Sequence, residues 1–188
     1  MDHFNKPLLI LDVDKTLIYA TKQPLNRTAD FTVFDYHVYR RPHLDTFIER
    51  VSKWFDIAIW SSAGNHYVQS IIRNLNLTTD LQFVWSRNEA TAKRQLNDFY
   101  ETGADTEYYY VKRLKKVKRK GYQLERILIV DDSPHKSQLN YGNAIYPKPY
   151  LGALEDDELL KLLVYLNSIK DEPNFRTIEK RNWRNSPA

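Results

Sequence analysis

Two aspartates spaced by one residue follow an aliphatic run near the start of the chain. The run Leu8-Leu-Ile-Leu11 precedes Asp12 and Asp14, and Thr16 follows two residues later. Alternate residues of an extended strand share a face, so both carboxylates address one small volume. Two carboxylates that close repel each other, and one protonates unless a cation lies between them. The pair therefore predicts a divalent-metal site, whereas an isolated Asp-x-Asp would more often be a solvated turn.

Further polar residues follow other apolar segments. Ser61 and Ser62 directly follow the segment Phe55-Asp-Ile-Ala-Ile-Trp60. Asp131 and Asp132 directly follow the segment Arg126-Ile-Leu-Ile-Val130. Lys112 begins a strongly basic stretch. Phosphoryl transfer requires a nucleophile, a proton donor, a cation, and groups that bind the phosphate oxygens. These residue types supply all four, although each residue alone could be an ordinary surface or capping group.

The segments that must position these residues alternate between strand and helix patterns. Buried-type strands are predicted at about 7–12, 55–60, 81–85, 126–131 and 144–146, and amphipathic helices at about 42–53, 65–75, 106–120 and 156–168. Residues 31–39 predict a small hairpin that turns near Asp35, whereas 86–106 fit no element well and give only a weak helix pattern. The alternation predicts an α/β fold with a doubly wound, mainly parallel sheet. Ligands of such sheets bind beyond the carboxyl ends of the strands.

The segment 106–120 combines helical spacing with positive charge. Its apolar positions Val111, Leu114 and Val117 recur every three residues, and Gly121 is suited to end a helix. Seven of the nine residues from Lys112 to Lys120 are lysine or arginine. An anionic partner or a solvated helix face would each explain this charge.

Composition excludes several classes of site. The chain has 188 residues, of which 42% are hydrophobic and 28% charged, as is ordinary for a globular domain, and its net charge is +4. It has no cysteine, so disulfides, thiolate catalysis and cysteine-ligated zinc are excluded. It has no apolar stretch long enough for a signal peptide or a membrane span, which predicts a cytoplasmic location, or a nuclear one if the source is eukaryotic. We expect one domain over 1–172 and a polar tail over 173–188.

The ordered motifs resemble one known family. The segments 11–17 (LDVDKTL), 41–47 (RPHLDTF), 59–63 (IWSSA), 110–114 (YVKRL) and 129–134 (IVDDSP) are similar to the successive signatures of the carboxy-terminal-domain phosphatase branch of the haloacid dehalogenase superfamily. This NLI-interacting-factor-like branch is also called FCP/SCP-like. The resemblance covers roughly residues 7 to 170, and it implies the Rossmann-like α/β fold of that superfamily.

The resemblance also implies a role for each motif residue. Asp12 would be the nucleophile that forms an aspartyl-phosphate, and Asp14 would be the general acid and base. Mg²⁺ would be held by the Asp12 carboxylate, the Asp14 main-chain carbonyl, and Asp131 or Asp132. Many relatives have Asp-Asn at this last motif, which leaves open which carboxylate is the ligand. Ser61, in competition with Ser62, and Lys112 would bind phosphate oxygens, and Thr16 would brace the loop.

The resulting prediction is a Mg²⁺-dependent phosphomonoester hydrolase that acts on a phosphorylated macromolecule. Only about 48 residues separate Asp12 from the end of the second strand, so no large cap domain is expected and the site should be open. An open site favours a phosphoprotein (serine or threonine) substrate.

Two alternative functions remain. The basic stretch leaves a polynucleotide or nucleotide phosphatase as one alternative, and a non-catalytic adaptor is another. The hairpin is shorter than in the nuclear phosphatases of this family, so specificity for a polymerase tail does not follow from the resemblance. The segment 86–106 is longer than is usual in the family and would shape a different entrance to the site. Neither a membrane partner nor an oligomeric state is indicated.

Overall fold

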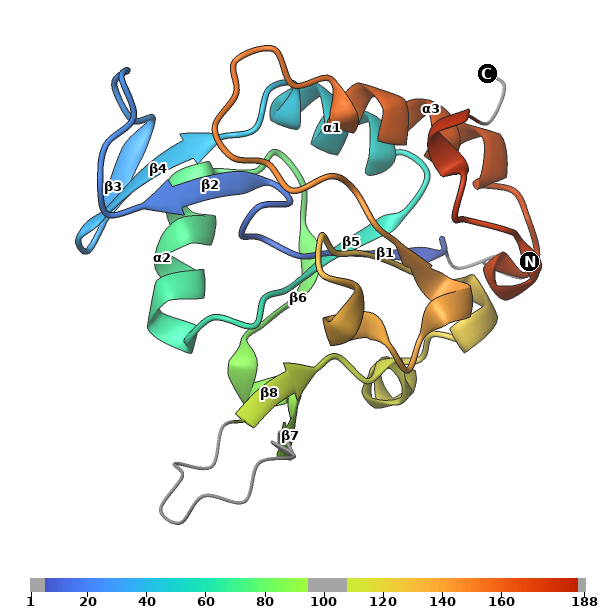
Figure 1. Cartoon of the computed structure of the whole chain (residues 1–188). Helices are drawn as coiled ribbons and strands as arrows, with labels where there is room; N and C mark the ends of the chain where they lie inside the picture. Colours follow the sequence, from blue (N-terminus) through green and yellow to red (C-terminus); the bar gives the residue numbers. More distant parts are fainter. Residues whose placement is uncertain (1–5, 95–107, 186–188) are drawn as a thin grey trace, which may run out of the picture.

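A five-stranded parallel sheet forms the centre of the computed structural model, which describes residues 6–94 and 108–185. Strand β1 (Leu8–Leu11) lies in the middle, between β9 (Ile127–Val130) and β5 (Asp56–Trp60). Strands β10 (Ala144–Ile145) and β6 (Leu81–Trp85) form the edges (Figure 1). The expected α/β fold with a parallel sheet is confirmed. The strands that carry the motif aspartates, β1 and β9, are direct neighbours.

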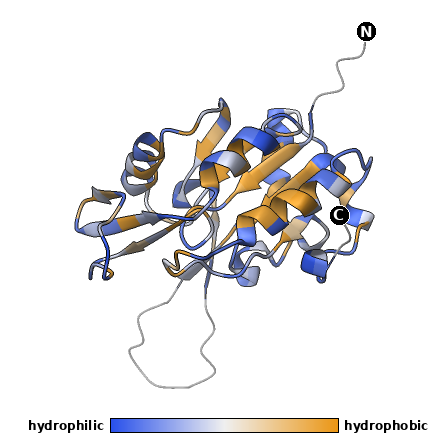
Figure 2. Ribbon diagram, turned by 90° about the horizontal axis from the view of Figure 1, so that it is seen from above, coloured by the Kyte–Doolittle hydropathy of each residue, from blue (hydrophilic) through white to orange (hydrophobic). Residues whose placement is uncertain are grey.

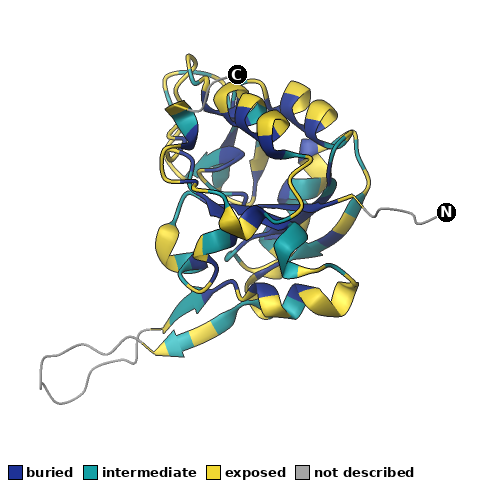
Figure 3. Cartoon of the chain, turned by 90° about the vertical axis from the view of Figure 1, so that its right-hand side faces the viewer, coloured by how far each residue is buried: buried dark blue, intermediate teal, exposed yellow. Residues whose placement is uncertain are grey.

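The central strands are buried on both faces. Every residue of β1 and β9 is buried, which explains why these segments are uniformly aliphatic. Successive side chains alternate between two cores: Leu9 and Leu11 contact one, Leu8 and Ile10 the other. The hydropathy colouring shows the sheet as an apolar centre, and the burial colouring shows the exposed residues on the outer elements (Figures 2 and 3).

The two faces of the sheet are covered differently. Helices α1 (Leu44–Val51), α2 (Asn65–Leu75) and α3 (Glu158–Ile169) contribute their apolar stripes to one core. Helices α1 and α3 lie side by side there (Figure 1). The other core is covered by short 3₁₀ segments, of which the longest is η2 (Leu114–Lys120), through Leu114 and Val117. The remaining 3₁₀ turns are η1 (Arg87–Glu89), η3 (Leu124–Arg126), η4 (Pro134–Ser137), η5 (Tyr141–Asn143), η6 (Phe175–Thr177) and η7 (Trp183–Asn185).

The predicted α-helix over 106–120 is wrong. Strand β8 (Tyr108–Val111) pairs antiparallel with β7 (Thr91–Arg94), and η2 follows Lys112 and Arg113. The physical reason lies in the spacing: apolar residues that recur every three positions match a 3₁₀ helix, which has three residues per turn. The aromatic run before Val111 also favours a strand. Gly121 does end η2, with φ 93°. Residues 95–106 of the weak helix pattern lie outside the described residues.

A small antiparallel sheet is inserted after β1. Strands β3 (Phe31–Val33) and β4 (Tyr36–Arg40) form the predicted hairpin, whose turn contains Asp35. Strand β2 (Ile18–Thr21), which was not predicted, pairs with β4. The described segment between β1 and α1 thus contains three strands and no helical cap, so the sheet edge that follows Asp12 is not covered by a second domain (Figure 1).

The segment after Pro173 packs against the domain. Phe175 and Trp183 are buried in the same core as the three α-helices, and the Trp183 indole donates to the Tyr146 carbonyl at 3.2 Å. The boundary at residue 172 stays a prediction. Within the described ranges, no helix has the length and apolar character needed to cross a membrane.

Candidate active site

The predicted site residues lie where three neighbouring strands end. The Asp12 N–H donates to the Val130 carbonyl at 2.9 Å, and the Asp131 N–H donates to the Ile145 carbonyl at 3.2 Å. The Ser61 N–H donates to the Trp85 carbonyl at 3.0 Å. These bonds extend the pairing of the sheet by one residue. The backbones of the two motif aspartates are therefore fixed by the sheet itself.

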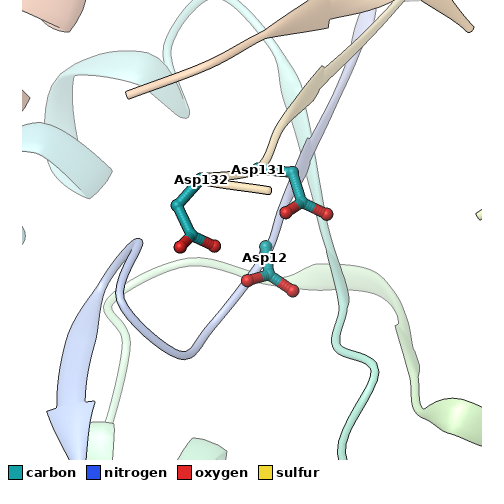
Figure 4. Close-up of side chains that lie close together, drawn as sticks. All are labelled: Asp12, Asp131 and Asp132. Atoms are coloured by element: carbon teal, nitrogen blue, oxygen red, sulfur yellow. The ribbon is translucent and has the colours of Figure 1, made fainter. Parts of the chain in front are cut away.

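Three carboxylates converge at this edge. Asp12, Asp131 and Asp132 each offer an oxygen, and these oxygens lie within 4.8 Å of one another (Figure 4). Asp12 is 1% exposed and Asp131 is fully buried, and Asp12 Oδ2 is buried without a hydrogen-bond partner in the described structure. A cluster of carboxylate oxygens is suited to Mg²⁺, which prefers oxygen ligands. The residues present therefore fit the predicted cofactor.

Lys112 connects two of these carboxylates. Its buried ammonium contacts Asp12 Oδ1 and donates to Asp131 Oδ2 at 2.6 Å. Burial opposes the charged ammonium, but Asp12 and Asp131 outweigh it, so the pKa of Lys112 is above its ordinary value. Asn140 holds the Lys112 main chain by donating to its carbonyl. Lys112 thus reaches the site from the end of β8, not from a helix.

The two consecutive aspartates differ in their hydrogen bonds. Asp131 uses both oxygens: Oδ2 accepts from Lys112, and Oδ1 accepts from the Ser133 N–H at 2.9 Å. Burial and the neighbouring Asp12 raise the pKa of Asp131, against the opposing effect of Lys112. Asp132 is only half-buried, and its Oδ1 accepts from the Ser133 hydroxyl at 3.1 Å. Its N–H donates to Thr16 Oγ1 at 3.2 Å, which is the bracing contact expected of Thr16.

Asp14 lies beside the cluster without joining it. Its carboxylate accepts a hydrogen bond from the Tyr67 hydroxyl at 2.6 Å. Burial raises the pKa of Asp14 above its ordinary value, the Tyr67 hydrogen bond lowers it, and the charge of Asp12 raises it again. Asp14 also lines an open cavity of about 460 Å³, together with aromatic residues of the hairpin and of α2: Phe34, Tyr36 and Tyr67. The carboxyl group can therefore face a substrate.

The two serines lie at the end of β5. Ser61 is buried, and its hydroxyl accepts from the Ala63 N–H at 3.0 Å. The Ser62 hydroxyl is buried and has no hydrogen-bond partner among the described residues, and the Ser62 carbonyl accepts from the Arg87 side chain at 2.9 Å. In the described part of the chain, neither serine hydrogen-bonds to the aspartates or to Lys112. Their role in phosphate binding stays a prediction.

Sequence reasoning missed two residues of the site. Tyr67 lies in the segment 65–75, which was predicted only as an amphipathic helix, and Lys136 was not among the candidates. The Lys136 ammonium lies 3.9 Å from Asp12 Oδ2 and 3.9 Å from Asp131 Oδ1. Its position two residues after the Asp131-Asp132-Ser133-Pro134 motif is the signal that could have identified it.

The comparisons with known proteins agree with this geometry. Residues 7–176 match the NLI interacting factor-like phosphatase family. The chain is 25% identical over 186 residues to the CTD small phosphatase-like protein of Homo sapiens. This alignment covers 95% of the chain and 61% of the human protein. The chain is 26% identical over 198 residues to the CTD nuclear envelope phosphatase 1B of Danio rerio, with 97% and 74% covered. The chain thus spans about three fifths of the length of the human relative.

A solved structure shares the fold. The structure of Fcp1, an essential RNA polymerase II CTD phosphatase, matches with a TM-score of 0.55 over 94% of this chain and 58% of that one. The two sequences are 16% identical, so this likeness concerns the fold alone.

Proposed function

This chain belongs to the NLI interacting factor-like phosphatase family, and from that premise we propose that it is a Mg²⁺-dependent phosphomonoester hydrolase. One observation carries the proposal. The buried Asp12 carboxylate has one oxygen held by Lys112 and the other without a hydrogen-bond partner in the described structure. Oδ2 therefore has a free lone pair with which to attack phosphorus, while Oδ1 fixes the orientation of the group.

The first step transfers the phosphoryl group to Asp12. Oδ2 forms a bond to phosphorus as the bond between phosphorus and the ester oxygen breaks, and protonated Asp14 gives its proton to the departing oxygen. The raised pKa of Asp14 favours this protonated state. Lys112, whose ammonium has three N–H donors and uses two on Asp12 and Asp131, has one left for a phosphate oxygen.

The second step hydrolyses the aspartyl-phosphate. Asp14, now a carboxylate, takes a proton from water as the water oxygen bonds to phosphorus, and the bond between phosphorus and Asp12 breaks. Inorganic phosphate leaves, and both aspartates return to their starting states. Mg²⁺, when bound by Asp12, Asp132 and the Asp14 main-chain carbonyl, supplies positive charge that balances the non-bridging phosphate oxygens. Asp132 is favoured over Asp131 because both oxygens of Asp131 already accept hydrogen bonds.

We favour a phosphoprotein as the substrate. The cavity beside Asp14 is open, lined partly by aromatic side chains, and bounded by a short hairpin rather than by a cap domain. Such a surface can accept a peptide segment on either side of a phosphorylated serine or threonine. The relatives named as CTD phosphatases support the same class.

The test is hydrolysis of an aryl phosphate by the purified protein. We expect Mg²⁺-dependent turnover, and we expect Asp12→Asn to lower kcat by at least about 10³-fold because the nucleophile is lost. Asp80→Asn is the matched control, since Asp80 is exposed and lies outside the site. Turnover that persists both in EDTA and in Asp12→Asn would contradict the mechanism.

A polynucleotide or nucleotide phosphatase is the second candidate, favoured by one observation. Four basic side chains and one threonine line a cavity of about 230 Å³ at η2: Thr91, Arg113, Lys115, Lys116 and Arg119. Contacts between such cations and nucleic-acid phosphates weaken steeply with salt. Comparing kcat/KM for phosphoserine peptides and 5′-phosphorylated oligonucleotides, at about 50 mM and about 200 mM salt, separates the two candidates. A higher and strongly salt-dependent value for the oligonucleotide would favour the second.

A further inference from the structure

Lys136 extends toward the nucleophile from a fixed backbone. It lies in η4, where its N–H donates to the Ser133 carbonyl at 3.0 Å and its carbonyl accepts from the Lys112 N–H at 2.8 Å. Its side chain is 20% exposed, whereas the side chain of Lys112 is fully buried. The two lysines therefore differ in access, because only the side chain of Lys136 is partly exposed to solvent.

The ammonium of Lys136 is near the carboxylates but not bonded to them. Its nitrogen lies 3.9 Å from Asp12 Oδ2 and 3.9 Å from Asp131 Oδ1, which is beyond hydrogen-bond length. Its N–H donors are therefore not used on these oxygens. Asp12 Oδ2 is also the oxygen that has no hydrogen-bond partner in the described ranges. A phosphorus atom in attacking position lies about 3–3.5 Å from that oxygen, so a non-bridging phosphate oxygen would come within reach of Lys136.

A second cation balances the charges of the site when every carboxylate is ionised. The acidic cluster and the neighbouring Asp14 supply four carboxylates, so Mg²⁺ with one lysine would leave one negative charge in excess. A phosphate monoester is itself a dianion and would be repelled. Among the described residues, the lysines or arginines within 4.0 Å of the carboxylates of the acidic cluster are Lys112 and Lys136. With Lys136 the cluster is neutral, and protonation of Asp14 makes it positive.

We propose that Lys136 is a second phosphate-binding residue, whose ammonium donates to a non-bridging oxygen of the phosphoryl group seated on Asp12. The proposal rests on the proposed function. A charge-assisted hydrogen bond to a phosphate oxygen is strong, and its loss from a partly exposed site corresponds to about tenfold in affinity. Because inorganic phosphate offers the same oxygens as the substrate, Lys136 should contribute to the binding of both.

The experiment compares Lys136→Met and Lys136→Arg with the wild type. Titration calorimetry with inorganic phosphate in the presence of Mg²⁺ measures binding without turnover, and aryl phosphate hydrolysis gives KM and kcat. We expect Lys136→Met to raise both the phosphate Kd and KM about tenfold, with a smaller change in kcat. Lys136→Arg should restore most of the binding, because arginine retains the charge and the donors.

Lys161→Met is the matched control. Lys161 is also a lysine paired with a carboxylate, Asp157 at 2.8 Å, but it lies on the exposed face of α3, so we expect wild-type Kd and KM. Thermal unfolding checks the fold of each variant, and Lys136→Gln replaces Lys136→Met if the latter does not fold. Unchanged phosphate binding without the lysine, or no recovery in Lys136→Arg, would overturn the proposal. A wild type that binds phosphate but hydrolyses no ester would instead overturn the proposed function.

Discussion

The hydroxyl of Tyr67 sets how readily Asp14 keeps its proton. It donates at 2.6 Å to the Asp14 carboxylate, which stabilises the charged form and lowers the pKa of a group that burial otherwise raises. The two effects act in opposite directions on the same acid. The Tyr67 hydrogen bond therefore offsets part of the effect of burial on the pKa of Asp14.

We predict that Tyr67→Phe moves the alkaline limb of the pH profile of kcat/KM to higher pH. Without the hydrogen bond the pKa of Asp14 rises further, so the acid stays protonated at a pH where the wild-type group has lost its proton. A phosphoserine peptide should be used, because its leaving oxygen needs a proton more than an aryl oxygen does. Tyr141→Phe, at an exposed tyrosine, is the control. A limb that stays in place or moves to lower pH would refute this role of Tyr67.

Residues that directly follow a strand could be located from sequence, whereas others could not. Asp12 and Asp131 lie beyond β1 and β9, so recognising two aliphatic runs was enough to place them at one edge. Tyr67 and Lys136 reach the site from α2 and η4. The orientation of these two elements depends on packing against the sheet, which no local spacing encodes. The positions of Asp12 and Asp131 were therefore predictable, and the neighbouring residues from other elements were not.

At the level of elements, the strands of the central sheet and the three α-helices were predictable, but strands β2, β7 and β8 and the type of the basic segment were not. Hydrophobic periodicity correctly gave β1, β5, β6 and β9, since a buried strand needs a continuous apolar run. In the basic segment only one residue in three is apolar, a spacing that is close to an α-helical stripe and identical to a 3₁₀ stripe. The segment η2 packs on one face of the sheet through Leu114 and Val117. Its spacing alone therefore could not tell a 3₁₀ helix from an α-helix.

Arg41 links the loop after β1 to the start of α3. Its buried guanidinium donates to both Asp156 oxygens, at 2.7 and 2.9 Å, and to the main-chain carbonyl of Thr16 at 3.0 Å. The Nη2 atom of Arg41, which bonds Asp156 Oδ2, also donates to the Lys148 carbonyl at 2.9 Å. One side chain thus fixes three separate segments: the loop after β1, the chain after β10, and the start of α3.

We predict that Arg41→Lys lowers the free energy of unfolding by about 3 kcal/mol. A lysine cannot reproduce the forked donor geometry, so Asp156 and the two carbonyls lose partners in a largely buried position. Urea denaturation measures the change. Lys53→Ala, which breaks the exposed pair with Glu49, should change stability by less than about 1 kcal/mol. Equal losses in the two variants would show that Arg41 is not a structural link.

Over the whole molecule, stability and function make opposite demands on the sheet edge. A hydrophobic core covers each face of the sheet. Phe175 and Trp183, near the end of the described chain, belong to one of these cores. The same fold then gathers Asp12, Asp131 and Asp132 within 4.8 Å, where their charges repel. The cores therefore stabilise an arrangement that the carboxylates alone would destabilise, and a bound cation should relieve that repulsion.

We predict that Mg²⁺ raises the melting temperature of the wild type and that Asp132→Ala abolishes this response. A ligand that binds only the folded state stabilises it, by about 2.7 kcal/mol at a concentration of about 100 times its Kd. Asp132→Ala removes the carboxylate whose oxygens are least engaged, and it also removes one repelling charge, so without metal it should be at least as stable as the wild type. Thermal unfolding with Mg²⁺ and with EDTA measures both effects.

The comparison with Asp131→Asn makes the assignment specific. Asp131 accepts a hydrogen bond from the buried Lys112, so its neutralisation leaves a buried cation with a weaker partner and should lower stability even in EDTA. Because Asp132, and not Asp131, is the proposed ligand, the Mg²⁺ response should remain in Asp131→Asn. The opposite pattern, in which Asp132→Ala still responds to Mg²⁺ and Asp131→Asn does not, would transfer the metal-ligand role to Asp131. The melting temperature thus decides between the two aspartates without any measurement of activity.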